Sequence, residues 1–261
     1  MATISEIATH IRSGALKFDR KHYALSLAHG ILQAQQCGYT KLTAIEFGVG
    51  EGGGFRSLVH CADYYRKQFG IEIEVYGFDN ATGLPAPQGY KDHPELWSQG
   101  AFRLPNVDQL RSELPQWAHL VIGDIADTVP EFTKEFEQND SKIGFISVDV
   151  DFYTSTVATL KVLDMPPLNY VPAVPMYFDD INWHITFSKY AGQELAIEEF
   201  NRDHKLRKLE SKENFMIENF HVCHIFDHPI RTGEARPRSP LDAFAKLPGV
   251  VHAPGIGGLV I

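Results

Sequence analysis

The chain has 261 residues, of which 44% are hydrophobic and 22% are charged. This composition is typical of a globular protein with a sizeable core, and it excludes wholesale disorder and a fibrous chain. The formal net charge is −9, from 24 Lys and Arg residues against 33 Asp and Glu residues. Because a protein that binds nucleic-acid phosphates normally carries the opposite sign, we expect no nucleic-acid partner.

Cysteine usage and apolar stretches bear on the compartment. The three cysteines are few, odd in number and widely spaced, which fits a reducing compartment better than a disulfide framework. The first residues hold no apolar run long enough for a signal peptide, and no stretch approaches the ~18 apolar residues of a membrane helix. We therefore expect a cytoplasmic protein with no membrane partner. The oligomeric state stays open, a homo-oligomer included.

Predicted helices and strands alternate along most of the chain. Two helices come first, at 4–11 and 20–36, within an N-terminal helical extension of residues 1–40. Strands are predicted at 42–47, 71–78, 119–122, 143–148 and 174–178, with the last strands within 215–226. Further helices are predicted at 55–69, 108–113, 128–138, 155–164 and 188–201. Such alternation is typical of βαβ units, so we predict a single α/β domain, 1–261, with a doubly wound, mostly parallel sheet.

A long polar stretch rich in Pro and Gly separates the second and third predicted strands. It spans residues 80–106 and exceeds the ~12–15 residues of an ordinary connecting loop. Loops of this length are usually lids or binding segments, so we predict a lid or substrate loop here. The alternative is a surface excursion with a helical turn around 95–99.

A glycine-rich turn, I-E-F-G-V-G-E-G-G-G at residues 45–54, joins a predicted strand to a predicted helix. Glycines let the backbone approach a ligand closely, and the helix N-terminus offers free N–H groups. Two cofactor classes use such a turn. Gly48, Gly50 and Gly53 fit the dinucleotide fingerprint G-x-G-x-x-G. Gly48, Gly50 and Gly52 fit the G-x-G-x-G turn of S-adenosylmethionine-dependent methyltransferases.

Glu46 distinguishes these two cofactor classes. It precedes the first glycine by two residues. A carboxylate attracts the ammonium and sulfonium groups of S-adenosylmethionine but repels a pyrophosphate. We therefore predict that Glu46 and the turn bind S-adenosylmethionine. A nicotinamide-dependent oxidoreductase is the alternative, and a glycine-rich turn without a ligand is a third interpretation.

Acidic residues follow the next two predicted strands. Asp79 ends the second strand, where a carboxylate accepts hydrogen bonds from ribose hydroxyls in both cofactor classes. Asp124 ends the third strand and, in a methyltransferase, would contact the adenine together with the backbone of Ile125. Each acid could instead cap the turn or helix that follows. Asp79 therefore supports nucleoside binding without discriminating between the cofactors.

Four carboxylates follow the fourth and fifth predicted strands: Asp149, Asp151, Asp179 and Asp180. In open α/β sheets the ligand crevice lies outside these strand ends. In extended chain Asp149 and Asp151 point the same way, whereas Asp179 and Asp180 point apart unless the chain turns. Clustered carboxylates repel one another, and a hard cation such as Mg²⁺ removes that conflict and orients a bound hydroxyl. The alternative is that each acid caps a helix or pairs with Arg or Lys.

Histidines offer weaker candidates. His221, Cys223 and His224 lie close together near the C-terminus, but alternation along a strand separates His224 from the other two and splits any zinc site. His184 follows Asp180 by four residues in a predicted loop and is a candidate general base.

Four segments, in the same order, resemble the macrocin O-methyltransferase (TylF) family. The first two are F-D-N-A-T-G-L-P at 78–85, which matches F-D-S-F-x-G-L-P of the family, and D-T-V-P-E-F at 127–132, which matches D-T-L-P-x-F. The third is V-D-V-D-F-Y-T-S-T at 148–156, which matches L-D-G-D-L-Y-x-S-T. The fourth is F-D-D at 178–180 followed by A-I-E-E-F at 196–200, which matches V-D-D-Y followed by A-x-x-E-F. With the glycine turn, the resemblance covers about residues 44–201.

The resemblance implies a seven-stranded, Rossmann-like class I methyltransferase fold and Mg²⁺-dependent methylation of a hydroxyl, often on a sugar of a secondary metabolite. It implies that Asp149, Asp179 and Asp180 ligate the metal, with Asp151 or Asp149 near the reacting hydroxyl as base. It also implies cofactor contacts by Glu46, the turn Gly48–Gly50, Asp79 and Asp124. We therefore predict an S-adenosylmethionine-dependent, Mg²⁺-assisted O-methyltransferase of a small molecule. Besides the oxidoreductase, a catalytically inactive binding protein of the same fold is an alternative.

Overall fold

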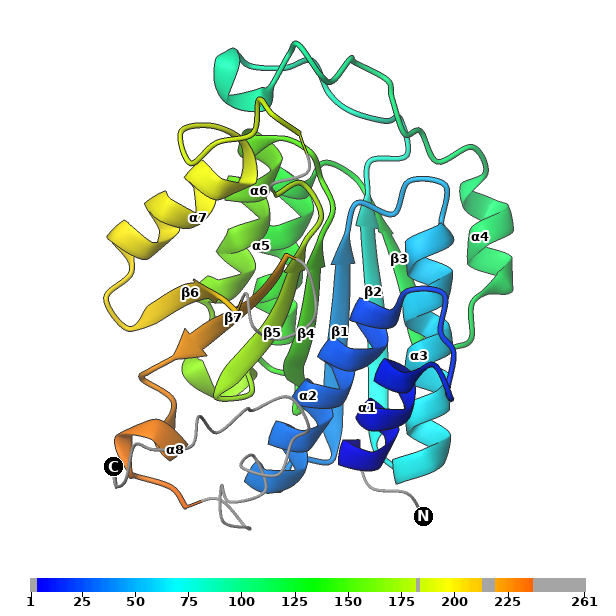
Figure 1. The fold of residues 1–261 in the computed structure, drawn as a ribbon, viewed down its shortest axis with the longest axis vertical. Helices are drawn as coiled ribbons and strands as arrows, with labels where there is room; N and C mark the ends of the chain where they lie inside the picture. The colour runs from blue at the N-terminus through cyan, green and yellow to red at the C-terminus, as the bar shows by residue number, and fades with distance from the viewer. Residues whose placement is uncertain (1–3, 182–183, 213–218, 237–261) are drawn as a thin grey trace.

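A computed structural model describes residues 4–181, 184–212 and 219–236 of the chain (Figure 1). Seven strands form one sheet in the order β3-β2-β1-β4-β5-β7-β6. Their bounds are β1 Lys41–Phe47, β2 Glu72–Asp79, β3 Ala118–Ile122, β4 Lys142–Val148, β5 Ala173–Phe178, β6 Arg207–Ser211 and β7 Phe220–Ile225. β7 pairs antiparallel with both β5 and β6, and the other pairs are parallel. The predicted mostly parallel, seven-stranded sheet is confirmed.

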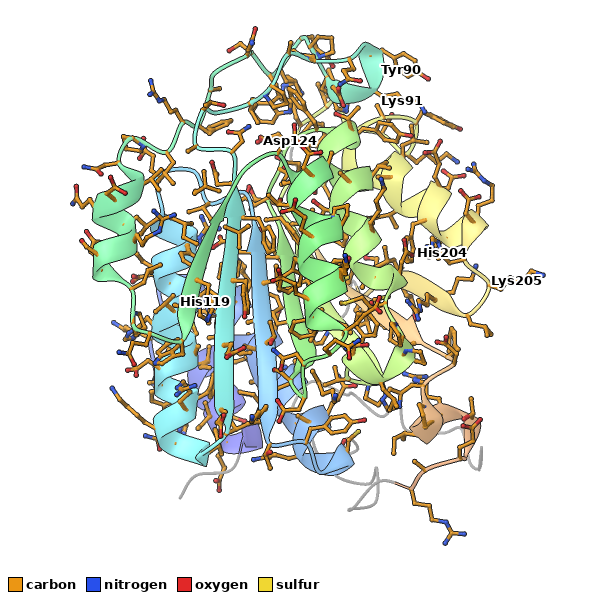
Figure 2. The ribbon with its side chains drawn as sticks, turned by 180° about the vertical axis from the view of Figure 1, so that it is seen from behind. Tyr90, Lys91, His119, Asp124, His204 and Lys205 are labelled. Carbon is orange, nitrogen blue, oxygen red and sulfur yellow. The ribbon has the colours of Figure 1, made fainter. Side chains whose placement is uncertain are left out.

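Helices cover both faces of this sheet (Figures 1 and 2). They are α1 Ile4–Ser13, α2 Lys21–Cys37, α3 Gly53–Phe69, α4 Val107–Glu113, α5 Ile125–Phe136, α6 Tyr153–Leu160, α7 Gly192–Asp203 and α8 Pro229–Thr232. On one face α2 and α3 pack against the central strands, and α1 packs on α2. On the other face α5, α6 and α7 pack side by side. Because helices cover both faces, the central strands β1 and β4 are buried along nearly their whole length.

The largest error in the predicted elements concerns the sheet edge. The last strands were expected within 215–226, but β6 lies earlier, at Arg207–Ser211, and β7 alone falls within the expected range. In β6 only Arg207 and Leu209 are buried. So short an edge strand, with one apolar and one charged residue facing inward, has almost no hydrophobic alternation to detect. In the described part of the chain no helix is long and apolar enough to cross a membrane.

Two glycines allow α2 to lie directly on β4. A Cβ atom on Gly30, in the middle of α2, would lie 2.0 Å from the carbonyl oxygen of Gly144 in β4. Backbone therefore meets backbone at this point, and no flexible side chain can move aside. This contact holds α2 across the face of the sheet, and Figure 1 shows its N-terminal end directed toward the carboxyl ends of the strands.

We expect Gly30→Ala to lower the free energy of unfolding by about 1–3 kcal/mol, because the added methyl group forces α2 away from β4. Gly53→Ala is the matched control, since it also replaces a helical glycine but meets no atom within 4 Å. The control should stay within about 0.5 kcal/mol of the parent. Urea unfolding followed by circular dichroism measures both, and equal stability of the Gly30→Ala variant and the parent would contradict the close packing.

Candidate active site

A cavity of about 620 Å³ lies at the carboxyl ends of β1, β2, β4 and β5. Segment 80–106 passes over this end of the sheet (Figure 1). The lining combines the glycine turn, strand-end carboxylates and part of this segment; its members are Arg20, Gly48, Val49, Gly50, Glu51, Gly53, Gly54, Asp79, Asn80, Gly83, Leu84, Pro85, Trp97, Ala101, Phe102, Ile125, Asp149, Val150, Asp151, Ser155, Asp179 and Asp180. The glycine turn and all four carboxylates after β4 and β5 thus share one space.

Steric contact dictates glycine at the first position of the turn. Gly48 has φ of +86°, and a Cβ there would lie 1.6 Å from the carbonyl oxygen of Asp149. The turn after β1 therefore lies directly against the chain leaving β4. Gly50 and Gly52 also have positive φ, of +52° and +86°, in the left-handed region that favours glycine.

The carboxylate of Asp79 holds this turn from the neighbouring strand. Its Oδ2 accepts hydrogen bonds from the backbone N–H groups of Val49 at 3.0 Å and Gly50 at 2.9 Å. Its Oδ1 accepts one from the N–H of Ala81 at 2.6 Å. The capping role of Asp79 is thus observed. A carboxylate has about four acceptor positions, so one remains for the predicted ribose hydroxyl.

Asp124 and Ile125 have different positions at the end of β3. Asp124 is exposed and caps α5, because its Oδ1 accepts from the N–H of Ala126 at 2.8 Å. Figure 2 shows Asp124 where β3 gives way to α5. This cap explains why α5 begins at Ile125, three residues before the predicted start. Within the described chain Ile125 lines the cavity and Asp124 does not. A contact between Asp124 and adenine stays a prediction.

Glu46 lies beneath the turn, behind the cavity wall, and is fully buried. Its Oε1 accepts a hydrogen bond from the Tyr23 hydroxyl at 2.7 Å, and that hydroxyl accepts one from Ser147 at 2.8 Å. Its Oε2 has no hydrogen-bond partner among the described residues. Burial raises the pKa of Glu46 to about 8, although the Tyr23 hydrogen bond and the Arg20 charge oppose this shift.

The strand ends bring the four predicted carboxylates together. Asp151 has φ of +57°, so the chain has already left the extended conformation. The prediction that Asp149 and Asp151 point the same way because they lie in extended chain is therefore wrong. Both residues nevertheless line the cavity. The N–H of Asp151 donates to Oδ2 of Asp180 at 3.1 Å, and the Tyr177 hydroxyl donates to Oδ1 of Asp179 at 2.7 Å.

Burial and the repulsion between like charges raise the pKa values of Asp149 and Asp151. Burial raises the pKa of Asp149, and the charges of Asp179 and Asp180 raise it further. Burial, then the charge of Asp149, raises the pKa of Asp151. Arg20 opposes the first of these shifts, since its Nη1 lies 3.5 Å from Oδ2 of Asp149. A group with a raised pKa can take a proton from a reacting hydroxyl near neutral pH.

The donor chemistry of this cluster suits a hard cation, but its arrangement does not yet form a metal site. Carboxylate oxygens are the ligands that Mg²⁺ prefers. However, no three acidic, histidine or cysteine side chains in the described chain are placed to hold one ion. Metal binding would require Asp149 to exchange its contact with Arg20 for the ion. Ligation by Asp149, Asp179 and Asp180 stays a prediction.

His184 lies outside the cluster of carboxylates after β4 and β5. Its Nδ1 is 2.9 Å from the hydroxyl oxygen of Thr186, and its ring packs near Phe187. It is not among the described residues that line the cavity. Its role as a base stays a prediction, and the geometry favours Asp151.

Several lining residues carried no signal in the sequence. Arg20 precedes α2 and reaches the site only because α2 packs against the sheet. Trp97 and Phe102 come from segment 80–106, and their rings meet edge to face with centroids 5.7 Å apart. The sequence offered one clue to Trp97 and Phe102. Both are aromatic residues in a long loop that is predicted to bind a ligand.

The raised pKa of Glu46 makes stability depend on pH. Its native pKa of about 8 exceeds the ordinary value of 4.5, so the native state binds more protons than the unfolded chain between these values. The free energy of unfolding therefore falls as pH rises through this window. Half-buried His22 and buried His29, with pKa values lowered to about 4 mainly by desolvation, act in the opposite direction around and below pH 6.5.

We therefore expect ionisation of Glu46 to lower the stability of the ligand-free protein between pH 6.5 and 8, on top of an opposite histidine contribution that the parent and a Glu46 variant share. In Glu46→Gln the slope should be shallower by up to about 1.4 kcal/mol per pH unit, the contribution of one proton. Urea unfolding at three pH values in this range measures the slope. The same slope in the parent and the variant would show that Glu46 is ionised in the native state.

The fold is similar to that of known methyltransferases. The calicheamicin methyltransferase CalS11 superposes with a TM-score of 0.57 at 19% identity, over 85% of this chain and 91% of that one. The O-methyltransferase NovP superposes with a TM-score of 0.54 at 15% identity, over 78% of each chain. No family model matches the chain, and neither does any curated protein. At these identities the likeness concerns the fold alone, and the chain has the Rossmann-like α/β fold of class I methyltransferases.

Proposed function

We propose that the protein is an S-adenosylmethionine-dependent O-methyltransferase. One observation carries the choice of cofactor: the carboxylate of Asp79 accepts the N–H groups of Val49 and Gly50. In a dinucleotide site those groups bind pyrophosphate. Here they are already paired with an anion, and a second carboxylate, Glu46, lies beneath the same turn. A nucleoside that carries a sulfonium suits a turn paired with the carboxylate of Asp79, whereas a pyrophosphate does not.

The acceptor would lie at the other end of the cavity, beside the carboxylates after β4 and β5. S-adenosylmethionine, when bound, supplies an activated methyl group on sulfur. The contribution of the chain is to align an acceptor hydroxyl and to take its proton, for which Asp151 is the best placed base, with Asp149 beside it. The volume, about 620 Å³, suits a small molecule. A sugar or secondary-metabolite hydroxyl is the substrate class we infer, in line with the resemblance of residues 44–201.

Mg²⁺ is the cation that would suit the oxygen donors of this acceptor end, once their side chains rearrange around it. Asp149, Asp179 and Asp180 would hold it, since they are oxygen donors at adjacent strand ends of one cavity. The cation would also relieve the repulsion that raises the pKa of Asp149. When bound, it would polarise the acceptor hydroxyl.

Segment 80–106 would form the substrate wall, fixed at its centre. Buried Asp92 accepts hydrogen bonds from the N–H and hydroxyl of Thr154, at the start of α6. Lys91 lies 3.5 Å from Glu199 of α7 and 4.4 Å from the ring centre of Tyr153. Figure 2 shows Lys91 in the turn above these helices. The apolar residues that segment 80–106 contributes to the cavity are therefore held by a segment that is fixed at Lys91 and Asp92. Only the parts of the segment on either side of these two residues would move when a substrate enters.

We expect the protein to bind S-adenosylhomocysteine in a calorimetric titration, with and without Mg²⁺, and not to bind NAD⁺. The reason is that the carboxylate of Asp79 already accepts the N–H groups of Val49 and Gly50, so it tolerates a neutral thioether nucleoside and repels a pyrophosphate. Binding of NAD⁺ without S-adenosylhomocysteine would replace the proposal with the oxidoreductase. Binding of S-adenosylhomocysteine together with no methyl transfer in a hydroxyl-acceptor screen would favour the inactive binding protein.

Metal binding can be measured without a known substrate. We expect Mn²⁺, a spectroscopic substitute for Mg²⁺, to bind the parent in an electron paramagnetic resonance titration and to bind Asp179→Asn at least about 10-fold more weakly. Asp108→Asn is the control, because its side chain is 97% exposed on α4, outside the cavity lining. Equal Mn²⁺ affinity in the parent and Asp179→Asn would remove the metal from the proposal and leave the methyl transfer standing.

A further inference from the structure

Charge in the cavity is distributed unevenly. Among the described lining residues one is a cation, Arg20, and six are acids: Glu51, Asp79, Asp149, Asp151, Asp179 and Asp180. An anionic group on any ligand is repelled by most of this wall. A ligand that carries a carboxylate must therefore place it at Arg20.

The guanidinium of Arg20 lies over the first turn of α3. A Cβ added to Gly54 would meet Cζ of Arg20 at 3.0 Å. The backbone N–H of Arg20 also donates to the hydroxyl of Ser57 in the same helix, at 3.3 Å. The side chain thus lies beside the N-terminal turn of α3, where the first N–H groups of a helix have no acceptor within the helix. A cation beside such N–H groups makes a site for an anion, at the junction of the glycine turn and the carboxylates.

Buried side chains hold the guanidinium in this place. Its Nη1 donates to the Tyr23 hydroxyl at 3.0 Å, and Cζ lies 5.1 Å from the centre of the Tyr23 ring. The same hydroxyl donates to Glu46 and accepts from Ser147, so its orientation is fixed. Nε and Nη2 of Arg20 make no hydrogen bond to any described residue, which leaves donors of the planar fork for a ligand. Its side chain is 32% exposed.

The proposed cofactor has one carboxylate, and charge favours one place for it in the cavity. The nucleoside end of the cavity lies at Asp79 and Ile125, and the acceptor end at Asp149 and Asp151. The sulfur must lie between the two ends, so that its methyl group faces the acceptor. Two walls remain for the amino-acid tail on sulfur. Segment 80–106 contributes no charged residue to the described lining, whereas the first turn of α3 lies beside the cation Arg20, so the tail with its carboxylate is expected there.

Resting on the proposed function, we propose that Arg20 binds the carboxylate of the methionine moiety of S-adenosylmethionine. Tyr23 and Glu46 are positioning residues that aim the guanidinium. An Arg–carboxylate pair of this kind is charge-assisted and can be bidentate. The carboxylate would use Nε and Nη2, while Nη1 keeps its contacts with the Tyr23 hydroxyl and with Oδ2 of Asp149.

The test compares two ligands on two proteins by calorimetry. The ligands are S-adenosylhomocysteine and its decarboxylated analogue, which keeps the ammonium group and lacks the carboxylate. We expect the parent to bind S-adenosylhomocysteine about 10- to 100-fold more tightly than the analogue, the range for hydrogen bonds to charged groups. In Arg20→Met this difference should vanish, with affinity for the analogue unchanged, and Arg20→Lys should restore part of it.

Each other outcome has its own meaning. Equal affinities of the two ligands for the parent overturn the inference without any variant, so it does not depend on the folding of Arg20→Met. An equal loss for both ligands in Arg20→Met also overturns it, since it shows a structural effect on the cavity. If the parent binds neither ligand, the proposed function itself fails, which is a result distinct from the other two.

Discussion

The contact between the turn after β1 and the chain leaving β4 is the constraint on which the site depends. A Cβ on Gly48 would lie 1.6 Å from the carbonyl oxygen of Asp149. The N–H of Asp149 donates to the carbonyl of Phe47 at 2.8 Å, so the parallel pairing continues past the strand ends. With no side chain between them, the glycine turn and the carboxylates become two walls of one cavity. Under the proposed function, a methyl donor on one wall would then face an acceptor on the other.

Buried charge is the second feature that organises the site. Glu46 lies between α2 and the first turn of α3, where burial raises its pKa to about 8. Such a group destabilises the native state unless it is protonated or paired. The Tyr23 hydroxyl donates a hydrogen bond to it and accepts one from Ser147, and the charge of Arg20 favours its ionised form. The loss of stability from burying Glu46 is typical of a functional site, because a buried acid gains a partner when a cationic ligand binds.

The fold and most of the lining could be predicted from the sequence because both rest on local patterns. Apolar runs such as 143–148 followed by helical periodicity indicate βαβ units, and strand ends in such units meet at one edge. The acids after these runs, Asp149 and Asp180 among them, were therefore placed correctly at the cavity. Prediction failed where the pattern was weak. The edge strand Arg207–Ser211 has little alternation, and the cap by Asp124 shifted the start of α5.

The sequence by itself determined the sheet, the glycine turn and the carboxyl-end acids, because each depends on residues close together in the chain. Only the tertiary structure decided how they are used. The Tyr23 hydroxyl joins Glu46 to Ser147, which lies 124 residues from Tyr23 in the chain, and Arg20 becomes the cation of an acidic cavity. These contacts exist because α2 packs across β4 at Gly30, and no local pattern encodes which distant side chains a packed helix will meet.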